Sequence, residues 1–394
     1  MRWTPQLRDF IQRHLNDDTS SLLLAAKKYP AIDVPSAVQQ IEARQRLKTK
    51  LPQWHANPNL IMSGRVPAEQ CSSEQTARYK RSIIDGQSLC DMTGGMGVDC
   101  WYMSEGMKQA IYTERDETLC HIARHNFQAL QDEQHPPIEV RHGDAQTLPL
   151  PSVDVIYLDP ARRAADGSRV YAIEDSQPNI IQWQDQLLRH AKTLLVKLSP
   201  MIDLTDTLRK LHSVTQVHIL ALRGECKEIL VKMENTPSAS QPVEVHCVDY
   251  LPSGTVDYTF TPSEEEAPIP TTDRVGQYLY EPDVTLMKAQ AFSSLTHRYP
   301  LRQLHRHTHL MTSDHRLPAF PGRTFVVEAH IPFASKTLKR LKSHIPQANI
   351  ATRNFPLTAD QLRQRTGIRD GGQVYLFGVK VQGQGHQLLQ CRKP

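Results

Sequence analysis

A glycine-rich segment with an acidic residue at each end is the part of this sequence best suited to chemistry. It reads Asp91-Met-Thr-Gly-Gly-Met-Gly-Val-Asp99, and it lies between an apolar run and a predicted helix. Glycines let a backbone turn tightly and approach a ligand that a Cβ atom would push away. The amino terminus of the following helix offers unpaired N–H groups to a polar or anionic group. Such a segment is typical of a loop that holds a nucleotide-like cofactor.

Two further acidic residues stand at the ends of predicted strands. Glu114 ends the second strand, 23 residues after Asp91, and Asp144 follows the third strand directly after Gly143. A carboxylate at the first position can accept hydrogen bonds from both ribose hydroxyls, and one at the second can accept from an adenine amino group. The glycine spacing differs from the G-x-G-x-x-G of NAD-binding proteins, and no G-x-x-x-x-G-K-[ST] segment for ATP occurs. A structural turn in an unrelated α/β protein is the alternative.

The elements that must position these residues begin near residue 86. Alternating strands and helices there imply right-handed crossovers and a mostly parallel sheet covered on both faces. Two runs joined across Gly224 predict a hairpin that closes the sheet edge. The strands are expected at 88–91, 110–114, 138–142, 153–159 and 193–199, the hairpin at 215–223 and 228–233, and one helix at 116–130.

The sequence on either side of this sheet has a different character. Apolar residues at three- and four-residue spacing predict helices within residues 1–85. Residues 235–275 are rich in Pro, Ser, Thr and Glu, and they predict a connector with two short strands. The remaining tail predicts a small α+β arrangement, with helices at 283–299 and 334–345 and strands at 322–331 and 373–381.

Charge is distributed unevenly along the 394 residues. The net charge of +4 combines +5 in residues 1–85, −12 in 86–275 and +11 in 276–394. A strongly basic tail favours a polyanionic partner. No apolar run approaches the length of a membrane span, the amino terminus lacks the pattern of a secretory signal, and the seven cysteines are scattered. We therefore expect a cytoplasmic protein with reduced thiols and no membrane contact.

The glycine loop and the acidic strand ends together resemble the class I S-adenosylmethionine-dependent methyltransferases. In that family the loop holds the methionine part of the cofactor, the second-strand acid holds the ribose, and the third-strand Asp reads adenine. The resemblance implies S-adenosyl-L-methionine as cofactor and a Rossmann-like α/β fold with a seven-stranded sheet. The residues it assigns to cofactor binding are Asp91, Thr93, Gly94, Gly95, Gly97, Glu114, Asp144 and Ala145, with Pro160 from the motif at the end of the fourth strand.

A closer resemblance extends over nearly the whole chain. Segments such as EQCSSEQTARYK, LDPARR, EDSQPNI, KLSPMID and RGECKEIL are similar to a bacterial family of methyltransferases that end in a ferredoxin-like piece and a THUMP-like domain. THUMP domains proper bind RNA in tRNA-modifying enzymes, so the resemblance implies an RNA substrate. The domains we expect are an N-terminal helical region (1–85), a methyltransferase domain (86–262), a linker (263–277), a ferredoxin-like piece (278–322) and a THUMP-like domain (323–394).

Asp159, at the end of the fourth predicted strand, is our candidate catalytic residue. Methyl donors of this kind are already activated, so the protein mainly aligns donor and acceptor, and a carboxylate can hold an acceptor N–H in place. A cofactor contact or a structural strand end is the alternative. Family members carry D-P-P-Y, N-P-P-Y or D-P-P-R here, whereas this chain has Ala161 and Arg162. It therefore lacks the aromatic residue that commonly stacks on a target base.

Several neighbouring side chains have a functional and a structural interpretation. Arg162 and Arg163 are candidates to clamp a phosphate or stack on a base, or else to pair with acids such as Glu174 or Asp175. Tyr79 and Lys80 resemble the family's cofactor-covering segment, with a helix surface as the alternative. Cys226 is the only thiol near the predicted top of the sheet, and we interpret it as a packed residue. Chemistry at pyrimidine carbon 5, which needs a Cys nucleophile, is therefore disfavoured.

Two basic clusters remain. His305, His307 and His309 alternate as on a strand, which favours a polar face toward RNA over a metal site, and we expect no metal. Basic residues in the run 44–50 predict a solvated helix face, with a weaker claim to RNA contact.

The sequence therefore predicts an S-adenosylmethionine-dependent methyltransferase that modifies a base in structured RNA, tRNA or rRNA, by direct transfer without a Cys nucleophile. A methyltransferase for a small molecule or a protein is the first alternative, and a non-catalytic RNA-binding protein with a vestigial cofactor fold is the second. The oligomeric state stays open.

Overall fold

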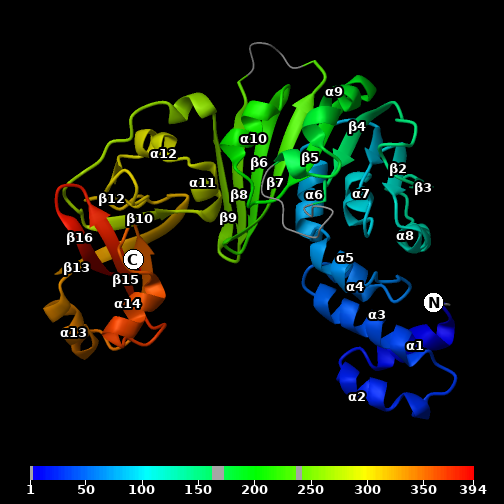
Figure 1. The fold of residues 1–394 in the computed structure, drawn as a ribbon, viewed down its shortest axis with the longest axis horizontal. Coiled ribbons are helices and arrows are strands. Elements are labelled where there is room, and N and C mark those ends of the chain that lie inside the picture. The colour runs from blue at the N-terminus through cyan, green and yellow to red at the C-terminus, as the bar shows by residue number, and fades with distance from the viewer. Residues whose placement is uncertain (1–2, 162–172, 237–241) are drawn as a thin grey trace. The chain divides into compact units, whose positions relative to one another are not determined.

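The computed structural model describes residues 3–161, 173–236 and 242–394 (Figure 1). The chain divides into two compact units, Met1–Thr215 with Leu230–Ala239, and Gln216–Ile229 with Ser240–Pro394. No helix within the described ranges is both long enough and apolar enough to cross a bilayer.

The first 85 residues are helical, as predicted. Side-chain oxygens of Thr4, Asp18, Asp33 and Ser73 accept hydrogen bonds from backbone N–H groups at the helix starts, which fixes where four helices begin. Trp54 from this region packs in one core with Trp101 and Phe127 from the helices of the following sheet. The helices are α1 (Pro5–Arg13), α2 (Thr19–Leu24), η1 (Ala26–Lys28), α3 (Val34–Leu47), α4 (Pro52–Ala56), α5 (Arg65–Gln70) and α6 (Glu74–Ser82).

The interpretation of the basic run 44–50 as a solvated face is wrong at Arg44. This side chain is fully buried and donates to the carbonyls of His55 and Asn57 at 3.2 Å each and of Leu60 at 2.5 Å. Burial lowers the pKa of Arg44 to about 10. Arg44 thus closes the chain around α4, because carbonyls that no helix or strand satisfies need a donor when they are buried.

The central sheet carries the predicted strands in the order β3-β2-β1-β4-β5-β7-β6-β8-β9. Strands β1 to β5 pair in parallel, and β4 and β5 are almost continuously buried, as strands covered on both faces must be. The strands are β1 (Ser88–Asp91), β2 (Gln109–Glu114), β3 (Ile138–His142), β4 (Val153–Leu158), β5 (Ala191–Leu198), β6 (Val214–Leu222), β7 (Glu225–Glu234), β8 (Glu244–Leu251) and β9 (Gly254–Phe260). Between them lie α7 (Val98–Met103), α8 (Glu117–Leu130), η2 (Ile173–Asp175), α9 (Ile180–His190) and α10 (Leu204–Lys210).

The expected Rossmann-like α/β sheet is present, but it has nine strands instead of seven. The predicted hairpin, β6 and β7, does not close the sheet edge, because β8 pairs in parallel with β6 and β9 pairs antiparallel with β8. These added strands are the two short strands expected within residues 235–275. The sequence pattern of these strands is weak because many of their residues are not buried; β9, for example, is largely exposed on one face.

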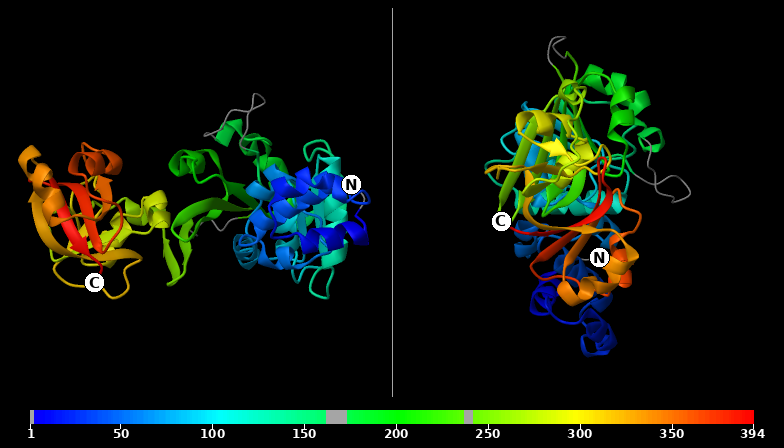
Figure 2. Two further views of the ribbon diagram at one scale, coloured as in Figure 1. Left: turned by 90° about the horizontal axis from the view of Figure 1, so that it is seen from below. Right: turned by 90° about the vertical axis from the view of Figure 1, so that its left-hand side faces the viewer.

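A second sheet of seven strands forms the small α+β arrangement predicted for the tail, in the order β11-β12-β10-β13-β16-β15-β14. Leu338 of α13, Leu362 of α14 and Leu376 of β15 pack together on one face, while Phe377 packs with Phe325 on the other. Figure 2 shows α13 and α14 lying together beside these strands. The elements after β9 are η3 (Pro262–Glu265), β10 (Tyr278–Pro282), α11 (Val284–Ala289), α12 (Ser293–Arg298), β11 (Arg302–Gln303), β12 (Met311–Ser313), β13 (Gly322–Pro332), α13 (Ser335–His344), β14 (Asn349–Arg353), α14 (Ala359–Thr366), β15 (Val374–Val381) and β16 (Gly385–Arg392).

Two expectations for the tail need correction. The single helix expected at 283–299 is broken into α11 and α12, because Gln290 adopts a left-handed conformation with φ of 58°. The alternating histidines do not lie on a strand. They occupy a turn between β11 and β12, where His309 stacks on Phe292 at a centroid distance of 4.3 Å and His305 contacts Asn354.

Replacing Arg44 should destabilise the protein strongly. Arg44→Ala leaves the buried carbonyl of Leu60 and the partly buried carbonyls of His55 and Asn57 without their donor and opens a cavity. We therefore expect a loss of about 3 kcal/mol or more in the free energy of unfolding. Arg46→Ala is the matched control. Arg46 lies on the same helix, but it is exposed and forms only ion pairs at 3.9 to 4.0 Å, so the change should stay within about 0.5 kcal/mol. Thermal unfolding of both variants checks this, and equal midpoints would contradict it.

Candidate functional site

The glycine loop is tied to the end of the neighbouring strand β4 by two hydrogen bonds, and a third holds the loop itself. Thr93 is central, because its N–H donates to Asp91 Oδ1 at 3.0 Å and its hydroxyl accepts from the N–H of Asp159 at 2.6 Å. The N–H of Met92 donates to the carbonyl of Tyr157 at 3.0 Å. The loop after β1 and the end of β4 therefore form one rigid edge, at the carboxyl ends of the parallel strands where ligands of open α/β sheets bind.

Glycine is favoured at the three loop positions for different structural reasons. A Cβ atom at Gly94 would lie 2.1 Å from the ring of Tyr112, and one at Gly97 would lie 2.7 Å from the ring of Phe127. These two glycines allow close packing inside the protein. A Cβ at Gly95 would meet only the Thr93 carbonyl, at 3.9 Å, although its φ of +52° favours glycine. Of the three, Gly95 is the one that can meet a ligand.

Asp91 is buried at the base of the loop. Only 1% of the residue is exposed, and its Oδ2 atom has no hydrogen-bond partner among the residues that the structure describes. Burial raises the pKa of Asp91 well above its ordinary value, an effect that neighbouring acids strengthen. An unpartnered, buried carboxyl oxygen at a ligand-binding edge is placed to accept from a donor that the protein does not supply.

Of the acids predicted at the ends of β2 and β3, Glu114 lies beside the loop, and Asp144 follows the neighbouring strand β3. Glu114 Oε2 accepts from the N–H of Gly95 at 2.8 Å, and its Oε1 accepts from the N–H of Asp116 at 2.9 Å. Gly143 donates to the Glu114 carbonyl at 3.0 Å, which joins the two strand ends. Asp144 is exposed and Ala145 beside it is buried. The structure thus brings Asp91, Gly95 and Glu114 together, with Asp144 on the next strand.

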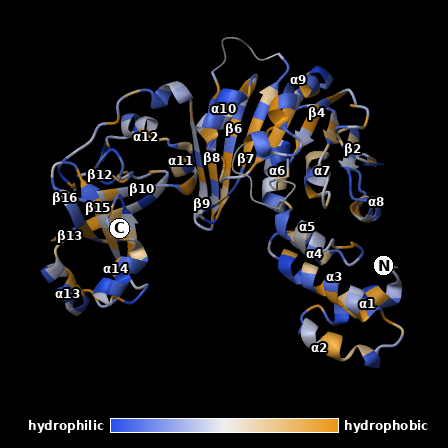
Figure 3. Cartoon of the chain, in the orientation of Figure 1, coloured by the Kyte–Doolittle hydropathy of each residue, from blue (hydrophilic) through white to orange (hydrophobic). Residues whose placement is uncertain are grey.

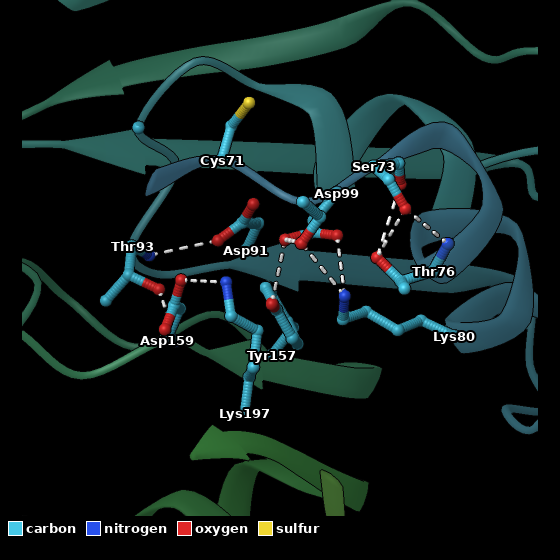
Figure 4. Close-up of polar contacts among 12 residues, drawn as sticks. Cys71, Ser73, Thr76, Lys80, Asp91, Thr93, Asp99, Tyr157, Asp159 and Lys197 are labelled. Atoms are coloured by element: carbon cyan, nitrogen blue, oxygen red, sulfur yellow. Dashed lines mark hydrogen bonds and ion pairs between the residues drawn. The ribbon is translucent and has the colours of Figure 1, made fainter. Parts of the chain in front are cut away.

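Lys197 is a residue of the site that the sequence analysis missed. It lies on β5 with only 4% of its side chain exposed, and its Nζ contacts Asp159 Oδ2 at the end of β4 (Figure 4). Asp159 is the more open partner, with 31% of its side chain exposed. A buried lysine inside an otherwise apolar strand, LLVKLS, was the available signal, because such a charge needs a partner.

A second buried cation lies beside this pair. Lys80 is fully buried on α6, 3.1 Å from Asp99 Oδ1 and 3.0 Å from the hydroxyl of Ser72. Asp99 Oδ2 accepts from Ser72 at 2.7 Å and from the hydroxyl of Tyr157 at 2.9 Å. Burial opposes ionisation of Asp99, but the charges of Lys80 and Lys197 outweigh it and lower the pKa of Asp99. Lys80 is therefore part of the site's polar network, as Figure 4 shows.

The remaining predicted site residues divide into two groups. Pro160 is buried directly after Asp159, and Tyr79 is half-buried on α6. Ala161 is exposed, and its N–H donates to the carbonyl of Gln177 at 2.8 Å. Arg162 and Arg163 lie outside the described residues, so their proposed contacts stay predictions.

Thiols and metal ligands contribute little to the described part of the site. Burial raises the pKa of Cys71, which is labelled in Figure 4, and raises that of Cys226 to about 11. Neither thiol has the lowered pKa that a nucleophilic cysteine needs. Within the described residues, no cluster of three His, Cys, Asp or Glu side chains could hold a metal ion.

Comparisons with known proteins place the chain among methyltransferases. Residues 278–321 match a ferredoxin-like domain family, and residues 322–393 match a THUMP domain-like family. The crystal structure of a Porphyromonas gingivalis W83 protein assigned as a methyltransferase is 38% identical, covers 100% of both chains and superimposes with a TM-score of 0.88. A Mycobacterium tuberculosis H37Rv protein called an uncharacterized S-adenosylmethionine-dependent methyltransferase is 23% identical over 304 residues, which cover 76% of this chain and 79% of that protein.

Asp91 should lower the stability of the free protein in a pH-dependent way. Its folded-state pKa is raised above the ordinary value of 3.8, so its contribution to stability is fully present below that value and is lost as the pH rises toward the raised pKa. Asp91→Asn removes this loss while its side-chain oxygen can still accept from Thr93. We expect its melting temperature to exceed that of the wild type by a margin that grows from about pH 5 to about pH 8. The exposed Asp144→Asn is the control, and a lower melting temperature for Asp91→Asn at neutral pH would contradict the assignment.

Proposed function

Because this chain belongs to the family of S-adenosylmethionine-dependent methyltransferases with C-terminal ferredoxin-like and THUMP-like domains, we propose that it methylates structured RNA, such as tRNA or rRNA. S-adenosylmethionine is the cofactor. The finer assignments below, of site residues and of substrate, belong to the proposal.

The residues at the sheet edge fit this cofactor. Asp91 offers a buried oxygen without a partner, which suits the ammonium group of the methionine part, and Gly95 leaves open space where a side chain would stand. Glu114, at the end of β2, is the residue for the ribose hydroxyls, and Asp144 with Ala145 lies at the place for adenine. When bound, S-adenosylmethionine supplies a methyl group on a positively charged sulfur.

Asp159 is the proposed catalytic residue, since it ends β4 beside the loop and is the more open member of its pair with Lys197. The reaction needs an acceptor held in line with the methyl group, and a charged pair at a rigid strand end supplies orientation and electrostatic stabilisation. Direct transfer without a cysteine nucleophile is supported by the raised pKa values of Cys71 and Cys226.

The observation that carries the RNA proposal is a basic helix in the THUMP-like part. Helix α13 has no acidic residue and presents the exposed cations Lys336, Lys339, Arg340 and Lys342, none in an ion pair with a described residue. Figure 3 shows α13 mostly in the colours of hydrophilic residues. Cations without protein partners can contact phosphates, which position RNA without reading its sequence.

The cofactor assignment is tested by calorimetry with S-adenosylhomocysteine. Glu114→Gln removes the negative charge that would accept from the ribose hydroxyls, so we expect affinity to fall at least about tenfold. The matched control is Glu117→Gln, an exposed acid in the first turn of α8, which should change affinity by less than about twofold. Equal affinities for the two variants, or no binding by the wild type, would refute the assignment.

The RNA assignment is tested by filter binding to unfractionated bacterial tRNA over a salt series. The triple variant Lys336→Ala, Lys339→Ala, Arg340→Ala should bind at least about tenfold more weakly near 0.1 M salt, with a shallower dependence on salt. A variant with the same loss of charge at the exposed Lys27, Lys28 and Lys48 is the control and should bind more tightly than the α13 variant. If both lose affinity equally, α13 is not the contact surface.

A further inference from the structure

We propose that the methyl acceptor is the 2′-hydroxyl of a ribose in RNA, not a base nitrogen, and that Lys197 removes its proton. This inference rests on the proposed RNA methylation and concerns the same site. It is carried by the contact between the buried Lys197 and Asp159, and by the second buried lysine, Lys80, on the neighbouring Asp99.

A base amino group would be served by a different arrangement. Such a nitrogen needs an oxygen that accepts its N–H, and commonly an aromatic residue on which the base stacks. Here an ammonium group occupies one carboxylate oxygen of Asp159, and the sequence has Arg162 at the motif position where the aromatic residue would be. The site therefore places a cation directly on its candidate acceptor carboxylate, and the motif lacks an aromatic residue for stacking.

A ribose hydroxyl has the opposite requirement. Its oxygen becomes a good nucleophile only as the proton leaves, so a base must stand at the acceptor atom. Lysine amines take this role when they are enclosed, because low-dielectric surroundings disfavour their charged form. Only 4% of the Lys197 side chain is exposed, and its amine contacts Asp159, a carboxylate that is 31% exposed.

The surrounding charges suit this proton transfer. Asp99 holds Lys80 and also interacts electrostatically with Lys197, so two lysines and two aspartates lie within a small region at the ends of β4 and β5. The acceptor oxygen forms its bond to the methyl carbon while the methyl–sulfur bond breaks and leaves its electron pair on sulfur. Lys197 first releases its ammonium proton to solvent, and the hydroxyl proton then passes to the neutral amine. One positive charge is lost at sulfur and one gained at Lys197, beside the carboxylate of Asp159.

The product decides between the two acceptors. Purified protein, total RNA from a strain that lacks the gene, and S-adenosylmethionine with a tritiated methyl group are incubated together, and the RNA is then hydrolysed in alkali. Alkaline cleavage needs a free 2′-hydroxyl, so ribose methylation leaves the label in dinucleotides that resist alkali. Label in mononucleotides means a methylated base and overturns this inference while the proposed function stands. Label in protein or in no RNA overturns the proposed function itself.

The role of Lys197 is tested separately with Lys197→Arg. Arginine keeps the positive charge and the pair with Asp159, but it cannot release its proton at any working pH. We expect the methylation rate to fall at least about 100-fold, while affinity for S-adenosylhomocysteine and the melting temperature stay close to wild type. A near-wild-type rate would overturn the role of Lys197 as base.

Lys232→Arg is the matched control. Lys232 is also a buried strand lysine, 8% exposed, and its Nζ lies 3.3 Å from Glu234. We expect its methylation rate to stay within about twofold of wild type. If Lys197→Arg does not fold, the alkali-resistance assay with wild-type protein still decides the acceptor, because it needs no variant.

Discussion

The buried contact between Lys80 and Asp99 is the interaction on which the rest of the site depends. It joins the last amino-terminal helix, α6, to the first helix of the sheet, α7, and Tyr157 connects the same carboxylate to β4. Breaking such a pair would leave an uncompensated charge in the protein interior, which costs several kcal/mol. The helical region is therefore not a separate attachment to the methyltransferase sheet: it supplies one of the charges that fix the geometry of the sheet edge.

This constraint also explains why the acidic centre of the sequence tolerates so many carboxylates. Some of them are neutralised by buried lysines, as Asp99 is by Lys80 and Asp159 by Lys197. Asp91 differs from these two, since burial and the nearby acids raise its pKa. The unpartnered oxygen of Asp91 fits the proposal that this carboxyl binds the ammonium group of the cofactor's methionine part.

Hydroxyl and nitrogen acceptors make different demands on the same sheet edge. Whichever atom receives the methyl group, the transition state must be aligned by groups that do not move, and the hydrogen bonds of Thr93 hold the glycine loop and the Asp159 backbone in one piece. A neutral hydrogen-bonding residue beside Asp159 would leave its carboxylate to accept a hydrogen bond from an acceptor N–H. A lysine at that position can instead remove a proton from the acceptor. In the proposed reaction, the choice of acceptor atom thus depends on Lys197 of β5.

Much of the protein followed from its sequence. Short apolar runs separated by helices predicted β1 to β7, because strands buried on both faces are apolar at nearly every position. The glycine loop and the acids at strand ends predicted the edge of the sheet that would bind the cofactor. The local sequence pattern could not show that Gly94 and Gly97 leave room for the rings of Tyr112 and Phe127, nor that Arg44 is buried. It also missed Lys197, since a charge in a strand becomes meaningful only when its partner on the neighbouring strand is known. Residue types and their order determined the cofactor class and the sheet, whereas tertiary structure decided which charges meet, because pairing across strands and helices depends on distance in space and not on spacing along the chain.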